Sequence, residues 1–308
     1  MSRPSCRQNT PLTMKRFDPH LLPLPKLHRT LLGAIAPRPI AFVSSVDAKG
    51  NHNLSPFSFF NAFGINPTTL IFSPSRRGRD NTVKDTYENV KEVPEVVINV
   101  VNYAMVEQMS LASSEYPSEV DEFIKAGFTP LPSETIRPMR VKESPAQFEC
   151  KVREVIETGD QGGAANLVIC EIRMIHLHPD ILDTEGEIDP EKIDLVGRLG
   201  GDYYCRASGE ALFRVAKPGR QPGIGVDILP ENVRLSRTLS GNDLGKLGSI
   251  DRLPSPLEIK EARQMSEVRD ILGAAGLSDK EKETQLHLLA RRILDSGEAR
   301  KALSILLI

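Results

Sequence analysis

Four basic side chains lie within nine residues of the chain and lead into a predicted helix. They are Arg76, Arg77, Arg79 and Lys84. The first amides of a helix have unpaired N–H groups and a partial positive charge, and arginine or lysine beside them completes a site for phosphate. Thr82 and Thr86 would add hydroxyl donors there. An isolated cluster of this kind is more often a solvated basic loop, and it is the polar strands before it that favour a phosphate site here.

Small polar side chains precede this loop on two predicted strands. Residues 40–46 are apolar and β-branched on both faces, which is typical of a buried strand. Turn residues at 47–50 lead into 53–62, where small polar and aromatic side chains alternate as in the second strand of a hairpin. Pro56 cannot donate a ladder hydrogen bond, so we expect an edge strand or a bulge there. The polar side chains are Ser44, Ser45, Asn53, Ser55, Ser58 and Asn61.

These hydroxyl and amide groups match the donors and acceptors along the pyrimidine edge of a flavin. Taken singly, each is better explained by a hydrogen bond to the neighbouring backbone. Together, the polar strands and the basic N-terminus of the following helix predict a binding site for a flat polar ring system that carries a phosphate.

The other elements of this region favour an antiparallel sheet or barrel. Further strands are predicted at 68–72, 95–101, 147–156 and 166–177. Helices are expected at 80–93, with Asp80 or Asn81 as the N-cap, and at 103–112 and 120–126. Because the helices are inserted between strands rather than alternating with them, a mainly β (α+β) fold is favoured over a doubly wound fold.

The sequence changes in character after about Asp227. Residues 228–308 carry helical patterns without a convincing strand, and Ser255 and either Ser278 or Asp279 have the positions of helix caps. The length of this region suits a small helical bundle. We therefore expect three parts, which are an N-terminal arm at 1–29, a sheet-bearing body at 30–226 and a helical extension at 227–308.

Composition excludes several classes of protein. The formal net charge of −2 supplies no basic excess for binding nucleic acid. No apolar run reaches membrane-spanning length and the first 25 residues lack the apolar core of a signal peptide, so we expect a cytoplasmic protein. The cysteines are far apart and form no CxxC pair, which predicts free thiols. They are Cys6, Cys150, Cys170 and Cys205.

Missing motifs narrow the chemistry further. The chain has no GxxxxGK[ST] phosphate loop and no GxSxG nucleophile elbow, and the glycines at 223 and 225 are too few for a dinucleotide fingerprint. His176 and His178 would share one face of a strand, but a third ligand with suitable spacing is missing. We therefore expect no metal site.

An ordered set of motifs resembles the flavin-reductase-like, FMN-binding split-barrel family. The motifs are PRPIAFVSS at 37–45, G..NLSPFSFFN at 50–61, NP at 66–67, KDT..N at 84–89, EVVIN at 95–99 and RLGGDYY at 198–204. The resemblance covers about residues 30–210. It implies a six-stranded antiparallel split β-barrel that forms a homodimer, with FMN held at the subunit interface. The helical extension is similar to that of the longer members.

The resemblance also implies roles for particular residues. Asn53 and the hairpin serines would face the isoalloxazine and the ribityl chain. Lys84, Asp85 and Thr86 would serve the phosphate, and Arg198 or Tyr203 would close the site. The full set of implied FMN-binding residues is Arg38, Ser44, Ser45, Asn53, Leu54, Ser55, Ser58, Asn61, Arg79, Lys84, Asp85, Thr86, Arg198 and Tyr203.

The implied activity is that of an NAD(P)H-dependent flavin reductase. FMN itself carries the redox chemistry, so no catalytic side chain is required. NADH or NADPH would supply the hydride, and free flavin, a metal chelate, oxygen or a partner oxygenase would receive the electrons. One alternative is a non-enzymatic FMN-binding electron carrier. Another is an oligomeric scaffold in which the barrel is vestigial and the helical extension mediates interaction.

Overall fold

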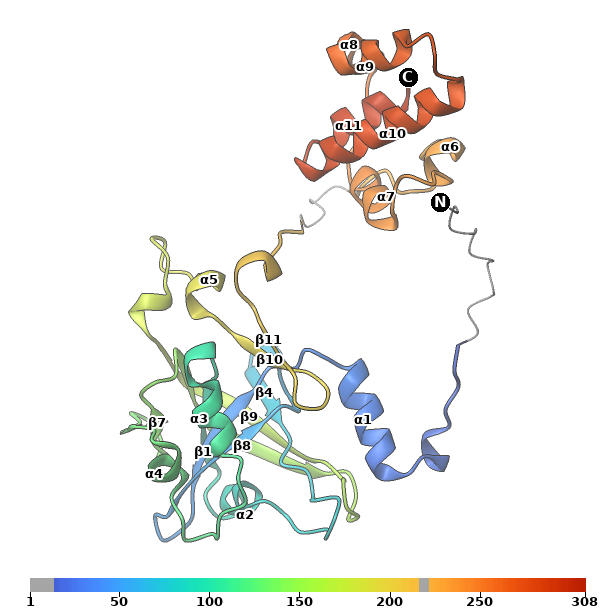
Figure 1. Ribbon diagram of the computed structural model, residues 1–308. Helices are drawn as coiled ribbons and strands as arrows, with labels where there is room; N and C mark the ends of the chain where they lie inside the picture. Colours follow the sequence, from blue (N-terminus) through green and yellow to red (C-terminus); the bar gives the residue numbers. More distant parts are fainter. Residues whose placement is uncertain (1–13, 216–221) are drawn as a thin grey trace, which may run out of the picture. The chain divides into compact units, whose positions relative to one another are not determined.

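The computed structural model describes residues 14–215 and 222–308. Cys6 and the first part of the predicted arm lie outside these ranges. The chain separates into two units, Met1–Phe213 and Arg214–Ile308, which are described in turn (Figure 1). Within the described residues, no helix is both long enough and apolar enough to cross a membrane.

The first unit is built on one seven-stranded sheet with the order β2-β1-β5-β8-β9-β4-β3, in which every neighbouring pair is antiparallel. Its strands are β1 Ala41–Val46, β2 His52–Phe57, β3 Phe60–Ile65, β4 Thr68–Phe72, β5 Glu95–Val100, β8 Ala146–Glu157 and β9 Asn166–Leu177. The predicted antiparallel, mainly β fold is confirmed, but the sheet has seven strands among the described residues where the resemblance implied six. The expected edge position of Pro56 is also confirmed, because β2 ends the sheet.

The segment predicted as one strand at 53–62 is two strands. β2 pairs with β1 at one edge of the sheet, whereas β3 pairs with β4 at the opposite edge. The chain crosses between the edges at Ser58 and Phe59, which belong to neither strand. An alternating pattern runs through both strands without a break, and for this reason the sequence did not show the crossing.

β1 lies between two apolar layers because its side chains are buried on both faces. Ile40 and Phe42 pack into a cluster with Phe123, whereas Ala41 and Val43 pack into a second cluster. Ser44 and Ser45, next along the strand, are fully buried. This buried strand pairs with β2 and therefore positions the polar side chains of β2.

Helices are inserted at the strand ends, mostly as predicted. They are α1 Leu24–Ala34, α2 Asp85–Glu92, α3 Val106–Leu111, preceded by the 3-10 turn Tyr103–Met105, α4 Glu122–Ala126 and α5 Pro190–Ile193. Helix α1 was missed because its region is rich in proline. Pro23 is its N-cap and Pro25 lies in its first turn, where the absent N–H costs no helical hydrogen bond.

The predicted start of α2 is wrong by one turn. Lys84, not Asp80 or Asn81, is the N-cap. The Asp80 carboxylate instead accepts from the amide and hydroxyl of Thr82, and Asn81 has a left-handed φ of 60°. These local bonds close a turn that ends before the helix begins. The first amides of the helix are consequently those of Asp85 and Thr86.

Two short hairpins complete the first unit. β6 Pro130–Leu131 pairs with β7 Arg140–Val141, and β10 Val196–Arg198 pairs with β11 Tyr204–Arg206. The second hairpin joins the N-terminal part of the unit through reciprocal backbone bonds between Arg38 and Arg198, at 3.0 and 2.9 Å. It therefore brings a distant part of the sequence beside β2.

The second unit is helical, as predicted. Its helices are α6 Glu231–Arg234, α7 Gly241–Gly248, α8 Pro256–Gln264, α9 Ser266–Gly273, α10 Asp279–Asp295 and α11 Ala299–Leu306. Ser255 and Ser278 are N-caps within capping boxes, which confirms the predicted starts of α8 and α10. The apolar faces of these helices enclose their own core, in which Leu247, Leu294 and Leu303 are fully buried.

His287 is a buried side chain of α10 that the structure accommodates in its neutral form. The Ser236 hydroxyl accepts from the amides of Thr238 at 3.1 Å and Leu239 at 3.2 Å, so its own proton donates to His287 Nδ1 at 2.7 Å. Burial lowers the pKa of His287, and the nearby Glu283 carboxylate opposes this shift.

The free energy of unfolding of the helical unit should therefore decrease in acid. His287 takes up a proton at higher pH in the unfolded chain than in the folded unit. The free energy of unfolding therefore falls as the pH drops below about 6.5, and it stops falling below the pKa of His287 in the folded unit. Urea unfolding followed by circular dichroism measures this loss, which should shrink in His287→Gln. All five tyrosines lie in the first unit, so their fluorescence provides an internal control. An identical pH profile in wild type and variant would contradict the assignment.

Candidate functional site

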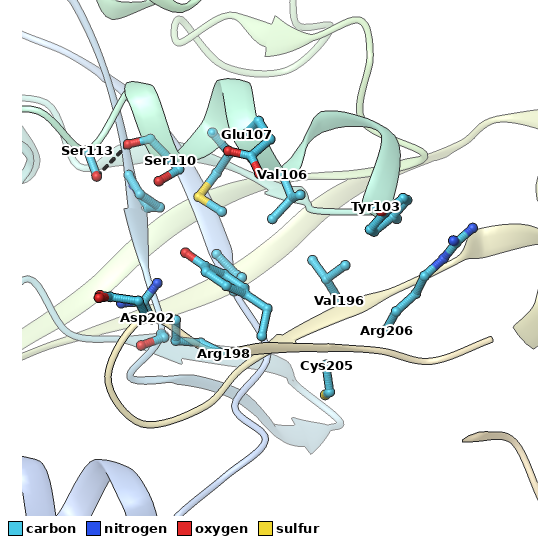
Figure 2. Close-up of a pocket in the computed structure, with 15 residues that line it drawn as sticks. Tyr103, Val106, Glu107, Ser110, Ser113, Val196, Arg198, Asp202, Cys205 and Arg206 are labelled. Atoms are coloured by element: carbon cyan, nitrogen blue, oxygen red, sulfur yellow. Dashed lines mark hydrogen bonds between the residues drawn. The ribbon is translucent and has the colours of Figure 1, made fainter. Parts of the chain in front are cut away.

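A cavity of about 710 Å³ lies between α3 and the β10–β11 hairpin (Figure 2). This volume is typical of small-molecule sites, which occupy about 300–1,000 Å³. Helix α3 and the turn after it line the cavity with Val106, Met109, Ser110 and Ser113. These side chains lie on one face because they recur at the helical spacing i, i+3, i+4 and i+7. Pro56 and Ser58 line the cavity from the end of β2.

The opposite wall carries two arginines stacked on tyrosines. The Arg198 guanidinium lies 4.5 Å from the ring centroid of Tyr204, and that of Arg206 lies 4.0 Å from the ring centroid of Tyr103. Arg206 also forms a bidentate pair with Asp194, at 2.6 and 2.8 Å, and this hydrogen bonding raises the pKa of Arg206. The Asp194 carboxylate therefore neutralises Arg206.

Arg198 is the cation of this wall that keeps donors for a ligand. One of its Nη groups donates to the Gly201 carbonyl at 2.8 Å, which closes the loop between β10 and β11. Its other N–H groups make no hydrogen bond within the described residues. Figure 2 shows Arg198 beside Asp202 on the hairpin, opposite the α3 side chains. This guanidinium is therefore suited to a polar or anionic group in the cavity.

A second, much smaller hollow of about 20 Å³ lies at the N-terminus of α2. Asn53 and Ser55 of β2 line it together with Lys84, Asp85 and Thr86. The amides of Asp85 and Thr86 donate no hydrogen bond within the described residues, as expected for the first turn of a helix. The hollow therefore presents unpaired N–H groups and a lysine, which is the arrangement predicted for a phosphate site.

A buried polar network fixes this hollow. The Asn53 amide donates to Thr86 Oγ1 at 2.8 Å and to Ser45 Oγ at 3.4 Å, and the Asn89 amide donates to Ser45 Oγ at 3.0 Å. Because Thr86 Oγ1 accepts from Asn53, its hydroxyl proton is available for another acceptor. Side chains from β1, β2 and α2 thus hold one another in place.

Charged groups of both signs line the hollow. Burial lowers the pKa of Lys84, and the nearby Arg77 guanidinium acts in the same direction. Burial raises the pKa of Glu122, whose carboxylate accepts from the amide of Leu54 at 2.9 Å. Both pKa shifts have the sign expected when burial removes water from a charged group and so disfavours its charged form. A phosphate oxygen beside Lys84 would stabilise its charged form.

The two hollows are neighbours in the fold. Ser113 lines both of them. In β2, Ser55 lines the smaller hollow and the next residue, Pro56, lines the larger cavity. An extended ligand with a ring at one end and an anion at the other would therefore lie across the end of β2.

The structure brings together half of the residues implied by the resemblance. Ser58 and Arg198 line the larger cavity, and Asn53, Ser55, Lys84, Asp85 and Thr86 line the smaller hollow. Ser45 supports this second group from behind. The remaining residues line neither cavity. They are the buried Arg38, Ser44 and Leu54 and the exposed Asn61, Arg79 and Tyr203.

Arg38 binds the protein's own backbone. It donates from Nη1 to the carbonyls of Leu32 and Ile35, at 2.8 and 2.7 Å, and from Nη2 to the carbonyl of Leu199 at 3.0 Å. Its Nε donates to Ser58 Oγ at 3.3 Å. Burial lowers the pKa of Arg38, and the charge of Arg198 adds to this effect. The side chain thus joins α1 to the loop that follows Arg198.

Sequence reasoning missed most of the α3 and hairpin side chains around the larger cavity. Tyr204 lines the cavity, whereas its neighbour Tyr203 is 75% exposed. The signal for α3 was its helical spacing of apolar and small residues. The hairpin pattern, with Val196, Arg198, Tyr204 and Arg206 as cross-strand neighbours, was too short to be recognised as strands.

Comparisons with known proteins agree with this architecture. Residues 33–190 match the model of the flavin reductase like domain. A protein of Aquifex aeolicus is 39% identical over 189 residues, covering 61% of this chain and 94% of that protein. Protein BH2278 of Halalkalibacterium halodurans is 38% identical over 192 residues, covering 61% and 90%.

Three solved structures are similar to the chain. The 2-nitrobenzoate 2-nitroreductase NbaA of Pseudomonas fluorescens has a TM-score of 0.60 and 28% identity, covering 68% of this chain and 100% of that chain. Nitrilotriacetate monooxygenase component B from Bacillus cereus has a TM-score of 0.61 and 29% identity, covering 66% and 99%. A protein with a split barrel domain from Shewanella frigidimarina has a TM-score of 0.56 and 26% identity, covering 65% of this chain and 96% of that chain. Since the family model spans just over half of the chain and the antiparallel sheet agrees with it, the chain belongs to the flavin reductase like domain family, with the split-barrel fold.

Proposed function

We propose that the chain is an FMN-dependent oxidoreductase that takes hydride from NADH or NADPH and passes electrons to an acceptor. The observation that carries the proposal is the pairing of two neighbouring hollows at the end of β2. One has the size of a small-molecule site, and the other presents unpaired helix amides and a lysine. Family membership supports flavin chemistry on this framework.

The residues present fit the groups of FMN. The amides of Asp85 and Thr86, the Thr86 hydroxyl and Lys84 would hold the phosphate. Arg77 Nε is a buried donor without a hydrogen-bond partner, and it lines the same hollow. Ser58 and Arg198 would bind polar atoms of the ring. When bound, FMN supplies the hydride chemistry, and the protein positions it and controls access to it.

We propose a homodimer as the working form. Apolar side chains that a single copy leaves exposed include Phe59, Phe63 and Ile65 on and beside β3, of which Ile65 is 90% exposed. β3 is an edge strand of the sheet, where unpaired backbone groups and apolar side chains favour association. A second copy on this face would cover them. Because the exposed Phe59 directly follows Ser58, which lines the larger cavity, FMN in that cavity would lie at the subunit interface.

The electron acceptor is proposed to be a partner oxygenase or a small molecule. The similar structure from Bacillus cereus is a component of nitrilotriacetate monooxygenase, and that from Pseudomonas fluorescens is a nitroreductase. Both names are compatible with electrons that leave the flavin for a second substrate. The larger cavity, with Arg198 on its wall, is where such a molecule or a nicotinamide would approach.

Anaerobic reduction tests the proposal directly. The full-length protein is saturated with FMN and mixed with NADH or NADPH, and the flavin absorbance is followed without oxygen. We expect bleaching with at least one nicotinamide, at a rate that equals or exceeds turnover with an added acceptor. If dithionite bleaches the flavin and neither nicotinamide does, the protein is an FMN electron carrier instead. If FMN does not bind, both proposals fail.

A further inference from the structure

Glu115 lines the smaller hollow and forms ion pairs with Arg77, which lines it too, and with Arg79 outside it. It follows α3, and its Oε1 lies 3.5 Å from Nε of Arg77. Its other carboxylate oxygen accepts from Nη2 of Arg79. This hydrogen bond lowers the pKa of Glu115, and the charges of Arg79, Arg77 and Lys84 act in the same direction. One carboxylate thus interacts with three cations.

The charge balance of the hollow is unfavourable for a phosphate while Glu115 remains there. Its lining holds two cations, Arg77 and Lys84, and three carboxylates, Asp85, Glu115 and Glu122. Its volume of about 20 Å³ has room for about one water molecule. A phosphate dianion would therefore enter only if one carboxylate moved away.

Glu115 is the carboxylate most able to move. Glu122 is nearly buried and bonded to the Leu54 amide, and Asp85 belongs to the first turn of α2. The Glu115 side chain is 44% exposed and lies on the loop between α3 and α4. Half-exposed ion pairs contribute little free energy, so exchanging this one costs little.

Arg77 is already arranged for the exchange. Its Nη1 donates to Thr82 Oγ1 at 3.0 Å and to the carbonyl of Val83, which fixes the guanidinium to the loop. Its Nε is buried and has no hydrogen-bond partner, although Glu115 is near. A phosphate oxygen in place of the carboxylate would accept from this donor.

We infer that Glu115 is an internal anion that competes with the ligand's phosphate for Arg77 and Lys84. This inference rests on the proposed function and adds a determinant of selectivity to it. A flavin with a phosphate displaces the carboxylate, whereas riboflavin leaves it in place. Glu115 therefore weakens the binding of FMN without affecting riboflavin, and it favours exchange of FMN over permanent retention.

Flavin fluorescence titration of the full-length protein tests this inference. Glu115→Gln removes the charge and keeps the size of the side chain. We expect it to bind FMN about three- to tenfold more tightly than wild type, and riboflavin with an affinity unchanged within about twofold. Glu119→Gln on the same exposed loop is the matched control, because Glu119 lines neither hollow and forms no ion pair within the described residues. It should leave both affinities unchanged.

The outcomes separate the inference from the proposed function. Equal FMN affinity in wild type and Glu115→Gln overturns the inference alone, as does tighter binding of riboflavin by the same factor. Weaker FMN binding by Glu115→Gln also overturns it, because the carboxylate would then hold the arginines in place for the ligand. If neither protein binds FMN, the proposed function fails together with the inference.

Discussion

Lys84→Met is expected to weaken FMN binding by about 10- to 100-fold and to leave riboflavin binding within about twofold. Lys84 is the N-cap of α2 and lines the hollow in which we place the phosphate. A hydrogen bond to a charged group contributes about 1.5–3 kcal/mol, which corresponds to this loss of affinity. Burial lowers the pKa of Lys84, so its ammonium gains more from a bound anion than an exposed lysine would.

Lys125→Met provides the control for this measurement. Lys125 is an exposed side chain of α4 that lines neither hollow. FMN and riboflavin affinities are compared for both variants by fluorescence titration at two salt concentrations. The wild-type preference for FMN should fall with salt, because phosphate binding is electrostatic, and in Lys84→Met this salt dependence should be weaker. An equal loss for FMN and riboflavin would place the phosphate elsewhere.

The strands of the sheet could be predicted because their burial repeats along the sequence. The apolar run at 40–46 predicted β1, which is buried at every position, and the alternation at 147–156 predicted β8. Pairing order could not be predicted in the same way. β2 and β3 follow each other directly but lie at opposite edges of the sheet. Local pattern determines which side chains are buried, whereas the order of strands depends on contacts that are distant in sequence.

The candidate site was predictable only where it is continuous in sequence. The polar side chains of β2 and the basic start of α2 lie within about thirty residues and could be recognised together. The larger cavity is assembled from α3 and from a hairpin about ninety residues further along the chain. No spacing rule connects these segments. For the same reason, the sequence identified Arg38 as a residue of interest but not as a donor to Leu199.

Replacing Arg38 with methionine is expected to reduce the free energy of unfolding of the first unit by about 3–5 kcal/mol. The side chain is 5% exposed and satisfies three backbone carbonyls. Methionine fills most of the space but leaves these acceptors without donors, at about 1–3 kcal/mol each before relaxation. Urea unfolding followed by tyrosine fluorescence reports this loss, because all five tyrosines belong to that unit.

The position of Arg38 also predicts a local effect that a general loss of stability would not produce. Its Nη2 bond to Leu199 and the backbone bonds to Arg198 hold the β10–β11 hairpin, which supplies Arg198 and Asp202 to the cavity. Under native conditions, Arg38→Met should be cleaved by trypsin after Arg198 faster than wild type, and its folded fraction should bind riboflavin about tenfold more weakly.

A core variant that is destabilised without touching the site distinguishes the two effects. Val43→Ala truncates a fully buried side chain of β1 that contacts neither hollow, and it should cost about 2–3 kcal/mol. This variant should bind riboflavin normally and keep the wild-type rate of cleavage after Arg198. Arg38→Lys retains one charged donor but cannot reach α1 and Leu199 at the same time, as the two Nη groups of arginine do. Compared with Arg38→Met, it should therefore regain part of the lost stability but little of the resistance to cleavage after Arg198. If Arg38→Met and Val43→Ala behave alike, Arg38 supports the fold alone and does not position the site.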